Sequence, residues 1–193
     1  MNYFTPGRII TTFLSKGNKE IIIRYPEWND IVSLTAYLNS ISQEDTYVYF
    51  AKRAISKEAV VGHIANICKD IELGNKLYIV ATHQGSIIGN CHIDIDVGKE
   101  TRGLHVGKLG LSIHKDYREE GIGSALFEQT KKEIAFMLPS VKMLMLEVFE
   151  SNSIAQNLYR KLGFVETGRI PEGILYKGEY MDEIIMCMSI LGE

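Results

Sequence analysis

At residues 118–125 the chain reads Arg-Glu-Glu-Gly-Ile-Gly-Ser-Ala, and the rest of the sequence is organised around this stretch. Before it, Leu109–Ile113 alternates in the manner of a strand. After it, residues at helical spacing lie along one side of a predicted helix: Ile122, Leu126, Thr130, Ile134 and Leu138. Pro139 ends that helix because proline cannot continue its hydrogen bonding. The stretch therefore predicts a strand, a glycine-bearing loop and a helix.

The loop between this strand and this helix suits a negatively charged ligand. Backbone N–H groups in the first turn of a helix have no internal partners, and the helix dipole favours negative charge there. Gly121 and Gly123 carry no side chain that would keep a phosphate from those N–H groups. Ser124 can add a hydroxyl and Arg118 a fixed positive charge, so the loop predicts a phosphate site.

The loop differs from the two familiar nucleotide-binding loops. A Gly-x-Gly-x-x-Gly pattern would need a glycine at the position of Leu126, and the Gly-Lys-Ser/Thr of a Walker loop does not occur in the sequence. A pair of glycines before a helix is also often only a tight turn. Taken alone, the loop indicates an anion site without identifying its ligand.

Length, composition and charge set the protein class. The 193 residues predict one domain with a substantial core, and 46% hydrophobic with 23% charged residues is ordinary globular composition. The formal net charge is −3 and no basic run is longer than that at Lys131-Lys132, so the sequence shows no electrostatic footprint for nucleic acid.

The cysteines and the apolar runs favour a cytoplasmic protein. Cys68, Cys91 and Cys187 are odd in number, far apart and without metal-ligand spacing, which suggests a reducing compartment. Residues 9–14 are broken by threonines and form no secretory pattern, and no apolar run approaches the length of a membrane span. We therefore expect a soluble protein without metal, nucleic-acid or membrane partners.

The remaining elements are shorter segments separated by turn-forming residues. Strands are expected at residues 7–14, 21–25, 77–81, 87–96, 104–113, 141–149, after 163, and 179–190. One helix is expected to be capped by Asn29 or Asp30 and to run to about Ile41, and a second is expected at residues 57–72 with Ser56 as its cap. Further helices are expected at residues 122–138 and 153–162. Residues 98–103 are expected to form a polar turn.

The segment at residues 141–149 is apolar on both faces, which is typical of a buried strand beside a parallel neighbour. Glu147 is its exception, and an unpaired carboxylate there would be costly. One interpretation is a satisfied structural carboxylate; the other is a base with a perturbed pKa. Asn152 then begins a short helix in which Ala155 and Tyr159 lie on one face. Without a function, Asn152 would be a helix cap and Tyr159 a packing residue.

Several motifs follow the loop in a fixed order: Leu146-Glu147-Val148, Asn152, Ala155, Leu158-Tyr159 and Leu162-Gly163-Phe164. Together with the loop they resemble the GNAT superfamily of acyl-CoA-dependent N-acetyltransferases. The resemblance covers roughly residues 77–190. It implies an α/β (α+β) GNAT fold over residues 1–193 as a single domain. In that fold a mixed, mostly antiparallel sheet with two splayed parallel strands is flanked by helices.

The resemblance also implies a site for acetyl-CoA as cosubstrate. The pantetheine arm would lie between the splayed strands, here residues 104–113 and 141–149. The residues implied to bind the cofactor are Leu111, Ser112 and Ile113 along the arm, the loop residues Arg118, Glu119, Glu120, Gly121, Ile122, Gly123 and Ser124 at the pyrophosphate, and Asn152, Ala155 and Tyr159. Tyr159 would stand near the sulfur as general acid.

Acyl-transfer chemistry is compatible with these assignments. An alkylammonium with a pKa of ~10.4 must lose a proton before its nitrogen attacks the thioester, and a thiolate leaving group with a thiol pKa of ~8.5 benefits from a nearby donor. Glu147, twelve residues before Tyr159, matches the base of the branch that acetylates a ribosomal-protein N-terminus. His105 and Asp94 are rival bases. Many relatives carry Glu where this chain has Lys108, so a base at that position is not expected here.

The expected function is therefore transfer of an acetyl group from acetyl-CoA to a primary amine: a small-molecule amine, a polyamine or a protein N-terminus. One alternative is a non-catalytic acyl-CoA sensor of the same fold, and another is a domain that reads ADP through the same loop. The acceptor is not identified, because the expected acceptor loops at residues 25–60 and 166–180 are weakly patterned. A homodimer is an option that the sequence leaves open.

Overall fold

The computed structural model describes residues 4–44, 47–48 and 52–190. The strands are β1 (Ile9–Leu14), β2 (Glu20–Arg24), β3 (Lys76–His83), β4 (Ser86–Ile95), β5 (Val106–Ile113), β6 (Met143–Phe149), β7 (Val165–Tyr176) and β8 (Glu179–Ser189). The α-helices are α1 (Ile31–Gln43), α2 (Lys57–Glu72), α3 (Glu100–Gly103), α4 (Ile122–Met137) and α5 (Ser153–Lys161). Short 3-10 helices are η1 (Trp28–Asp30), η2 (Val97–Lys99) and η3 (Lys115–Tyr117).

The described strands form one eight-stranded sheet in the order β1-β2-β3-β4-β5-β6-β8-β7. The pairs β1–β2, β2–β3, β3–β4, β6–β8 and β7–β8 are antiparallel, and β5–β6 is parallel. The parallel pairing joins Val106–Lys108 to Met143–Met145, which are only the first three positions of β5. The predicted mixed, mostly antiparallel sheet with a parallel pair is confirmed.

The chain divides into two compact units. The first contains Met1–Asp94 and Gly110–Pro139; the second contains Ile95–Leu109 and Ser140–Glu193. Strand β5 therefore begins in the second unit and ends in the first. A single domain over residues 1–193 stays a prediction.

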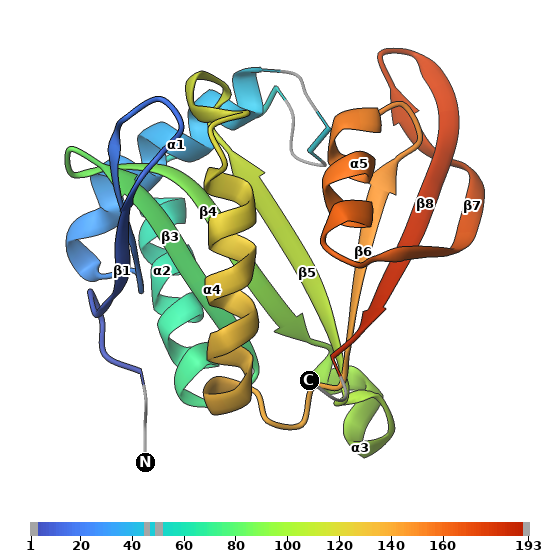
Figure 1. The fold of residues 1–193 in the computed structure, drawn as a ribbon, viewed down its shortest axis with the longest axis horizontal. Coiled ribbons are helices and arrows are strands. Elements are labelled where there is room, and N and C mark those ends of the chain that lie inside the picture. The colour runs from blue at the N-terminus through green and yellow to red at the C-terminus, as the bar shows by residue number, and fades with distance from the viewer. Residues whose placement is uncertain (1–3, 45–46, 49–51, 191–193) are drawn as a thin grey trace. The chain divides into compact units, whose positions relative to one another are not determined.

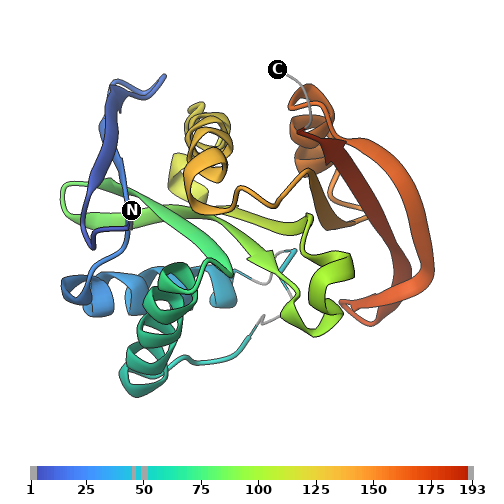
Figure 2. The same ribbon diagram turned by 90° about the horizontal axis from the view of Figure 1, so that it is seen from below.

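The first unit places helices on both faces of its strands. Helix α4 covers one face, and α1 and α2 cover the other (Figure 2). Because both faces are covered, Leu77–Ala81 of β3 is buried throughout, as is typical of a central strand. The predicted stripe of α4 is confirmed: Ile122, Leu126, Thr130, Ile134 and Leu138 are all buried.

The second unit is built on β6, which lies between the start of β5 and β8, with α5 following it in the chain (Figure 1). The predicted position of this strand inside the sheet beside a parallel neighbour is confirmed, since β6 pairs in parallel with β5. Leu144, Leu146 and Val148 are buried; on the other face Phe149 is buried, whereas Met143, Met145 and Glu147 are half-buried. The apolar side chains on the two faces of β6 are therefore not equally buried, because a flexible methionine can occupy a partly covered face.

Two local predictions need correction. Asp30 precedes α1 but does not cap it: its carboxylate accepts hydrogen bonds from Arg24 and from the N–H of Glu27. Residues expected as a polar turn at 98–103 form the end of η2 and the short helix α3. By contrast, the Oγ of Ser56 caps α2 by accepting from the N–H of Ala59, as predicted.

Candidate active site

The predicted phosphate loop joins β5 to α4 in the first unit. Glu119 and Gly121 both have left-handed backbone conformations, with φ of 64° and 85°. Gly121 is the N-cap of α4, and no side chain accepts a hydrogen bond from the first turn. The first helical bond joins the N–H of Ala125 to the carbonyl of Gly121 at 3.1 Å. The N–H groups of Ile122, Gly123 and Ser124 therefore lack an intrahelical partner, as an anion site requires.

Glu120 is held away from this helix terminus by the turn between β1 and β2. Its carboxylate accepts hydrogen bonds from Ser15 Oγ at 2.6 Å and from Lys19 Nζ at 2.5 Å. These two contacts, Lys19 first, lower the pKa of Glu120 below its ordinary value. A Cβ on Gly17 would lie 2.8 Å from the same carboxylate, so the turn and the loop fit closely. The carboxylate of Glu120 thus belongs to a structural contact, and only its backbone is left for the predicted cofactor role.

Arg118 also has partners. Its Nε donates to the carbonyl of Ile113 at 3.0 Å, and its Nη2 donates to Glu44 Oε2 at 2.7 Å. Glu44 follows the end of α1 and lies 74 positions away in the sequence. The guanidinium expected at a phosphate is therefore fixed by a carboxylate in this structure.

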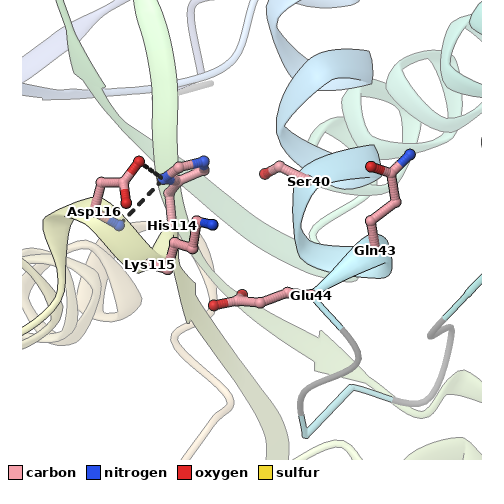
Figure 3. Close-up of a pocket in the computed structure, with 6 residues that line it drawn as sticks. All are labelled: Ser40, Gln43, Glu44, His114, Lys115 and Asp116. Carbon is pink, nitrogen blue, oxygen red and sulfur yellow. Dashed lines mark hydrogen bonds and ion pairs between the residues drawn. The ribbon is translucent and has the colours of Figure 1, made fainter.

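A polar hollow of about 430 Å³ lies beside this ion pair, also within the first unit. Its lining residues are Ser40, Gln43, Glu44, His114, Lys115 and Asp116. Figure 3 shows the end of α1 on one side and the residues after β5 on the other. Sequence reasoning did not find this hollow, because no local pattern shows that the end of α1 reaches the end of β5.

The predicted arm-binding residues, Leu111, Ser112 and Ile113, are half-buried at the end of β5. Ser112 is held in a hydrogen-bond network: its Oγ lies 2.6 Å from the hydroxyl of Tyr37 and 2.8 Å from Asn90 Oδ1. The Tyr37 hydroxyl also lies 3.0 Å from the Ser112 carbonyl. Burial raises the pKa of Tyr37, so its hydroxyl remains a donor. This network fixes the strand segment, and it was not expected from the sequence.

Asp94, one rival base, is committed to neighbours on β3 and β4. It forms an ion pair with Lys76 and lies 3.6 Å from His92 Nε2. Burial lowers the pKa of His92 to about 4, because it disfavours the charged form of the ring. The His92 ring occupies the space beside Gly110, where a Cβ would lie 2.2 Å from the ring. This close approach explains why β5 has a glycine at that position.

Glu147 lies in the second unit with a partner of its own. Lys108 Nζ donates to Glu147 Oε2 at 2.7 Å, and the Glu147 side chain is 21% exposed. The structural interpretation of Glu147 is thus supported by a salt bridge, while its role as base stays a prediction. His105 pairs through its carbonyl with the N–H of Met143, at the other end of β6. Glu147 lies four residues beyond Met143, about 13 Å along a strand, so His105 and Glu147 are not interchangeable.

The residues predicted on α5 are also brought together in the second unit. Asn152 is the N-cap, and its Oδ1 accepts from the N–H of Ala155 at 3.2 Å. Tyr159 is buried, with 8% of its surface exposed, and packs edge-on against Phe164 with ring centroids 5.8 Å apart. The cap and packing contacts expected without a function are therefore present. The roles of Asn152, Ala155 and Tyr159 toward a cofactor stay predictions.

In the described part of the chain, no group of three or more His, Cys, Asp or Glu side chains could hold a metal ion. Within the same residues, no helix is long and apolar enough to cross a membrane.

Comparison with known proteins finds one family model and several relatives that resemble this chain. A family model described as the acetyltransferase (GNAT) domain matches residues 74–166. The L-amino acid N-acetyltransferase AaaT of Escherichia coli strain K12 is 32% identical over 108 residues. This match covers 56% of the present chain and 65% of the length of that relative.

Solved structures agree with this match. A GNAT-family acetyltransferase from Streptococcus pneumoniae has a TM-score of 0.77 at 28% identity, covering 88% of this chain and 99% of the other. RimL, a ribosomal-protein alpha-N-acetyltransferase in complex with coenzyme A, shares the fold with a TM-score of 0.78 at 13% identity, covering 95% and 98%. The sheet and the loop agree with these matches: residues 74–166 match the acetyltransferase (GNAT) domain, and the chain shares the fold of a solved GNAT-family acetyltransferase.

Proposed function

We propose that this protein transfers an acetyl group from acetyl-CoA to a primary amine. The observation that carries the proposal is the open first turn of α4, which presents the N–H groups of Ile122, Gly123 and Ser124 without a side-chain cap. The family supports it, because relatives are named as N-acetyltransferases and one was solved with coenzyme A.

In this proposal the loop amides hold the diphosphate of the cofactor. Leu111, Ser112 and Ile113 line the pantetheine arm. Arg118 places its positive charge beside the diphosphate. To do so, its guanidinium must either share its contact with Glu44 or break that contact. Bidentate guanidinium contacts to phosphate are strong enough to compete with a single exposed carboxylate contact.

The chemical step in this proposal uses two side chains of the second unit. Glu147 takes a proton from the ammonium of the acceptor, directly or through water, and the freed amine attacks the thioester carbonyl. Tyr159 gives a proton to the departing thiolate of CoA. Lys108 Nζ already donates to Glu147 Oε2 at 2.7 Å, so the acceptor amine must approach this carboxylate beside the salt bridge.

The class of acceptor remains a small-molecule amine, a polyamine or a protein N-terminus. The name of the Escherichia coli relative makes L-amino acids the first group to test. We also propose a cytoplasmic location, which is supported by the three free cysteines, Cys68, Cys91 and Cys187. A homodimer and the absence of nucleic-acid or membrane partners stay predictions from the sequence.

Turnover with acetyl-CoA over a panel of amines tests the proposal. The panel contains L-amino acids, polyamines, N-terminal peptides and aminoglycosides, and release of free CoA thiol is measured beside calorimetry with CoA and ADP. Binding of CoA with turnover of one amine class supports the proposal. CoA binding without turnover of any amine favours the sensor, and equal affinity for ADP and CoA favours the nucleotide-binding alternative.

The base is tested separately by Glu147→Gln. This change should slow turnover at neutral pH and remove the acidic limb of the rate–pH profile, because the amide cannot accept the proton. Glu179→Gln is the matched control, since Glu179 is exposed at the start of β8 in the same unit. If Glu147→Gln folds and keeps the wild-type rate and profile, the carboxylate is structural and His105 becomes the next candidate.

A further inference from the structure

The turn between β1 and β2, residues Ser15–Lys19, packs against the predicted phosphate loop. The backbone N–H of Lys16 donates to the carbonyl of Glu120 at 3.1 Å, and the side chains of Ser15 and Lys19 hold the carboxylate of the same residue. Lys19 Nζ also donates to the carbonyl of Asp116 at 3.3 Å. The turn is thus fixed to the loop at several points, although the two segments are about a hundred positions apart in the sequence.

This packing places Lys16 beside the first turn of α4. A Cβ built on Gly121 would lie 3.8 Å from Lys16 Cε, the nearest atom from outside the loop and its helix. The ammonium nitrogen is one bond beyond Cε, so it can reach an anion seated on the N–H groups that follow Gly121. The backbone of Lys16 is already held, so only its side chain must be ordered on binding.

The ammonium of Lys16 has no ion-pair partner in the described part of the chain, unlike the charged groups of Lys19 and Arg118. Lys19 is paired with Glu120, and Arg118 is paired with Glu44. In the described part of the chain the ammonium of Lys16 has no hydrogen bond and no ion pair, and its side chain is exposed. Lys16 therefore supplies positive charge at the helix terminus without first giving up a carboxylate partner.

We propose that Lys16 binds the diphosphate of the CoA cosubstrate and that the β1–β2 turn is a part of the cofactor site. The inference rests on the proposed function, since it names a further binding residue for the same cofactor. An ammonium is a compact point charge, so it would add attraction for the diphosphate without fixing its orientation. Orientation would remain with the loop amides and Arg118.

Calorimetry with CoA on the full chain tests this inference. Lys16→Gln should raise the Kd for CoA about 5- to 10-fold, the effect of one charge-assisted contact at an exposed site, and this loss should shrink at high salt. Lys16→Arg should restore most of the affinity. Lys132→Gln is the matched control, because Lys132 is exposed on α4 about 15 Å from Gly121 and should have no effect.

Truncated cofactors identify the group that Lys16 contacts. The loss in Lys16→Gln should persist with dephospho-CoA, which lacks the 3′-phosphate, and should vanish with acetyl-pantetheine, compared through kcat/KM. Equal affinity of wild type and Lys16→Gln for CoA overturns the inference, as does a loss confined to CoA with its 3′-phosphate. Wild-type protein that does not bind CoA at all overturns the proposed function itself, so the two failures are distinguishable.

Discussion

The N-termini of α4 and α5 are built in opposite ways. Helix α4 begins at Gly121, and no side chain caps its first turn. Helix α5 begins at Asn152, whose side chain accepts from the N–H of Ala155, and α2 is capped in the same way by Ser56. A side-chain cap satisfies one of the unpaired N–H groups of the first turn, whereas an uncapped terminus leaves all of them to water or a ligand.

In the proposed function this difference corresponds to two tasks. In our proposal α4 holds the charged end of the cofactor, because its amides are open and Lys16 and Arg118 lie near them. In helix α5 the N–H of Ala155 is already satisfied by Asn152, and the main contribution proposed for this helix is the side chain of Tyr159. Variants in the first turn of α4 should therefore weaken binding of the cofactor, whereas loss of the Tyr159 hydroxyl on α5 should lower turnover.

The largest expected effect is on turnover, from Tyr159→Phe. Loss of the hydroxyl removes the proposed proton donor and should lower kcat by ~10²–10⁴-fold, the usual contribution of general acid catalysis. The affinity for CoA and the melting temperature should change little, because the ring still packs against Phe164. Steady-state rates at saturating amine, with a thermal melt of each variant, make the measurement.

Tyr180→Phe is the control for this change, since Tyr180 is an exposed tyrosine of the same unit. A packing role for Tyr159 predicts the opposite result: near-normal turnover in the Phe variant and a loss of about 3–5 kcal/mol of unfolding free energy in Tyr159→Ala. That result, under conditions in which chemistry limits the rate, would remove Tyr159 from the mechanism and revive the non-catalytic sensor.

The next effect is on binding, from Gly123→Asp in the first turn of α4. A carboxylate beside the diphosphate should weaken CoA binding about 100-fold or more, because it replaces an attractive contact by repulsion and occupies the space next to the amides. Gly62→Asp adds the same charge to the exposed face of α2 and is the matched control. Unchanged affinity in Gly123→Asp, measured by calorimetry, would place the cofactor elsewhere.

Local patterns predicted the features that depend on neighbours in the sequence. The buried stripe of α4 follows from helical spacing and Pro139, and the open terminus follows from the glycines of the loop. The cap on α2 was equally readable from Ser56. These signals are local because helix periodicity, glycine conformation and capping are each set within a few residues.

The contacts between distant segments could not be predicted in the same way. Three such contacts form only because the sheet order brings distant strands and turns together: Arg118 with Glu44, Ser15 with Glu120, and Lys108 with Glu147. Glu147 is one example. The apolar pattern around it indicated an unusual carboxylate, but its salt-bridge partner, Lys108, is 39 positions away in the sequence.

A smaller effect separates the two roles of Asn152. Asn152→Ala should cost about 1 kcal/mol of unfolding free energy through the lost cap. Asn152→Asp keeps the oxygen that accepts from Ala155 and should keep most of that stability, but it lacks the amide donor that Asn152 would offer to the cofactor. Both variants should therefore weaken CoA binding a few-fold, whereas only the Ala variant should lower stability in urea.

Ser56→Ala removes a cap of the same kind from α2 and should lower stability by a similar amount without any change in CoA affinity. Asn152→Asp that binds CoA as well as wild type would show that Asn152 serves only as a cap. The contrast between a structural α5 terminus and a ligand-binding α4 terminus would then be complete.

The smallest expected effect is a pH dependence of the free energy of unfolding. It should arise at the α4 loop and not at the start of α5. The loop is held by the charged carboxylate of Glu120, whose pKa is lowered by Lys19 and then by Ser15, whereas the cap of α5 is a neutral amide that does not titrate. Below the ordinary carboxyl pKa of 4.5 the unfolded chain binds a proton at this position that the folded protein does not. The stabilisation is therefore complete above that pH and is lost as the pH falls through the lower folded-state value.

Urea unfolding at a series of acidic pH values, with wild type and Glu120→Gln, measures this contribution. The variant should lose less stability than wild type over the acidic range, because its amide remains neutral throughout. Glu119→Gln is the control, since Glu119 is an exposed neighbour in the same loop. Parallel stability curves for wild type and Glu120→Gln would contradict the prediction, and the β1–β2 turn would then be held to the loop by its backbone contact alone.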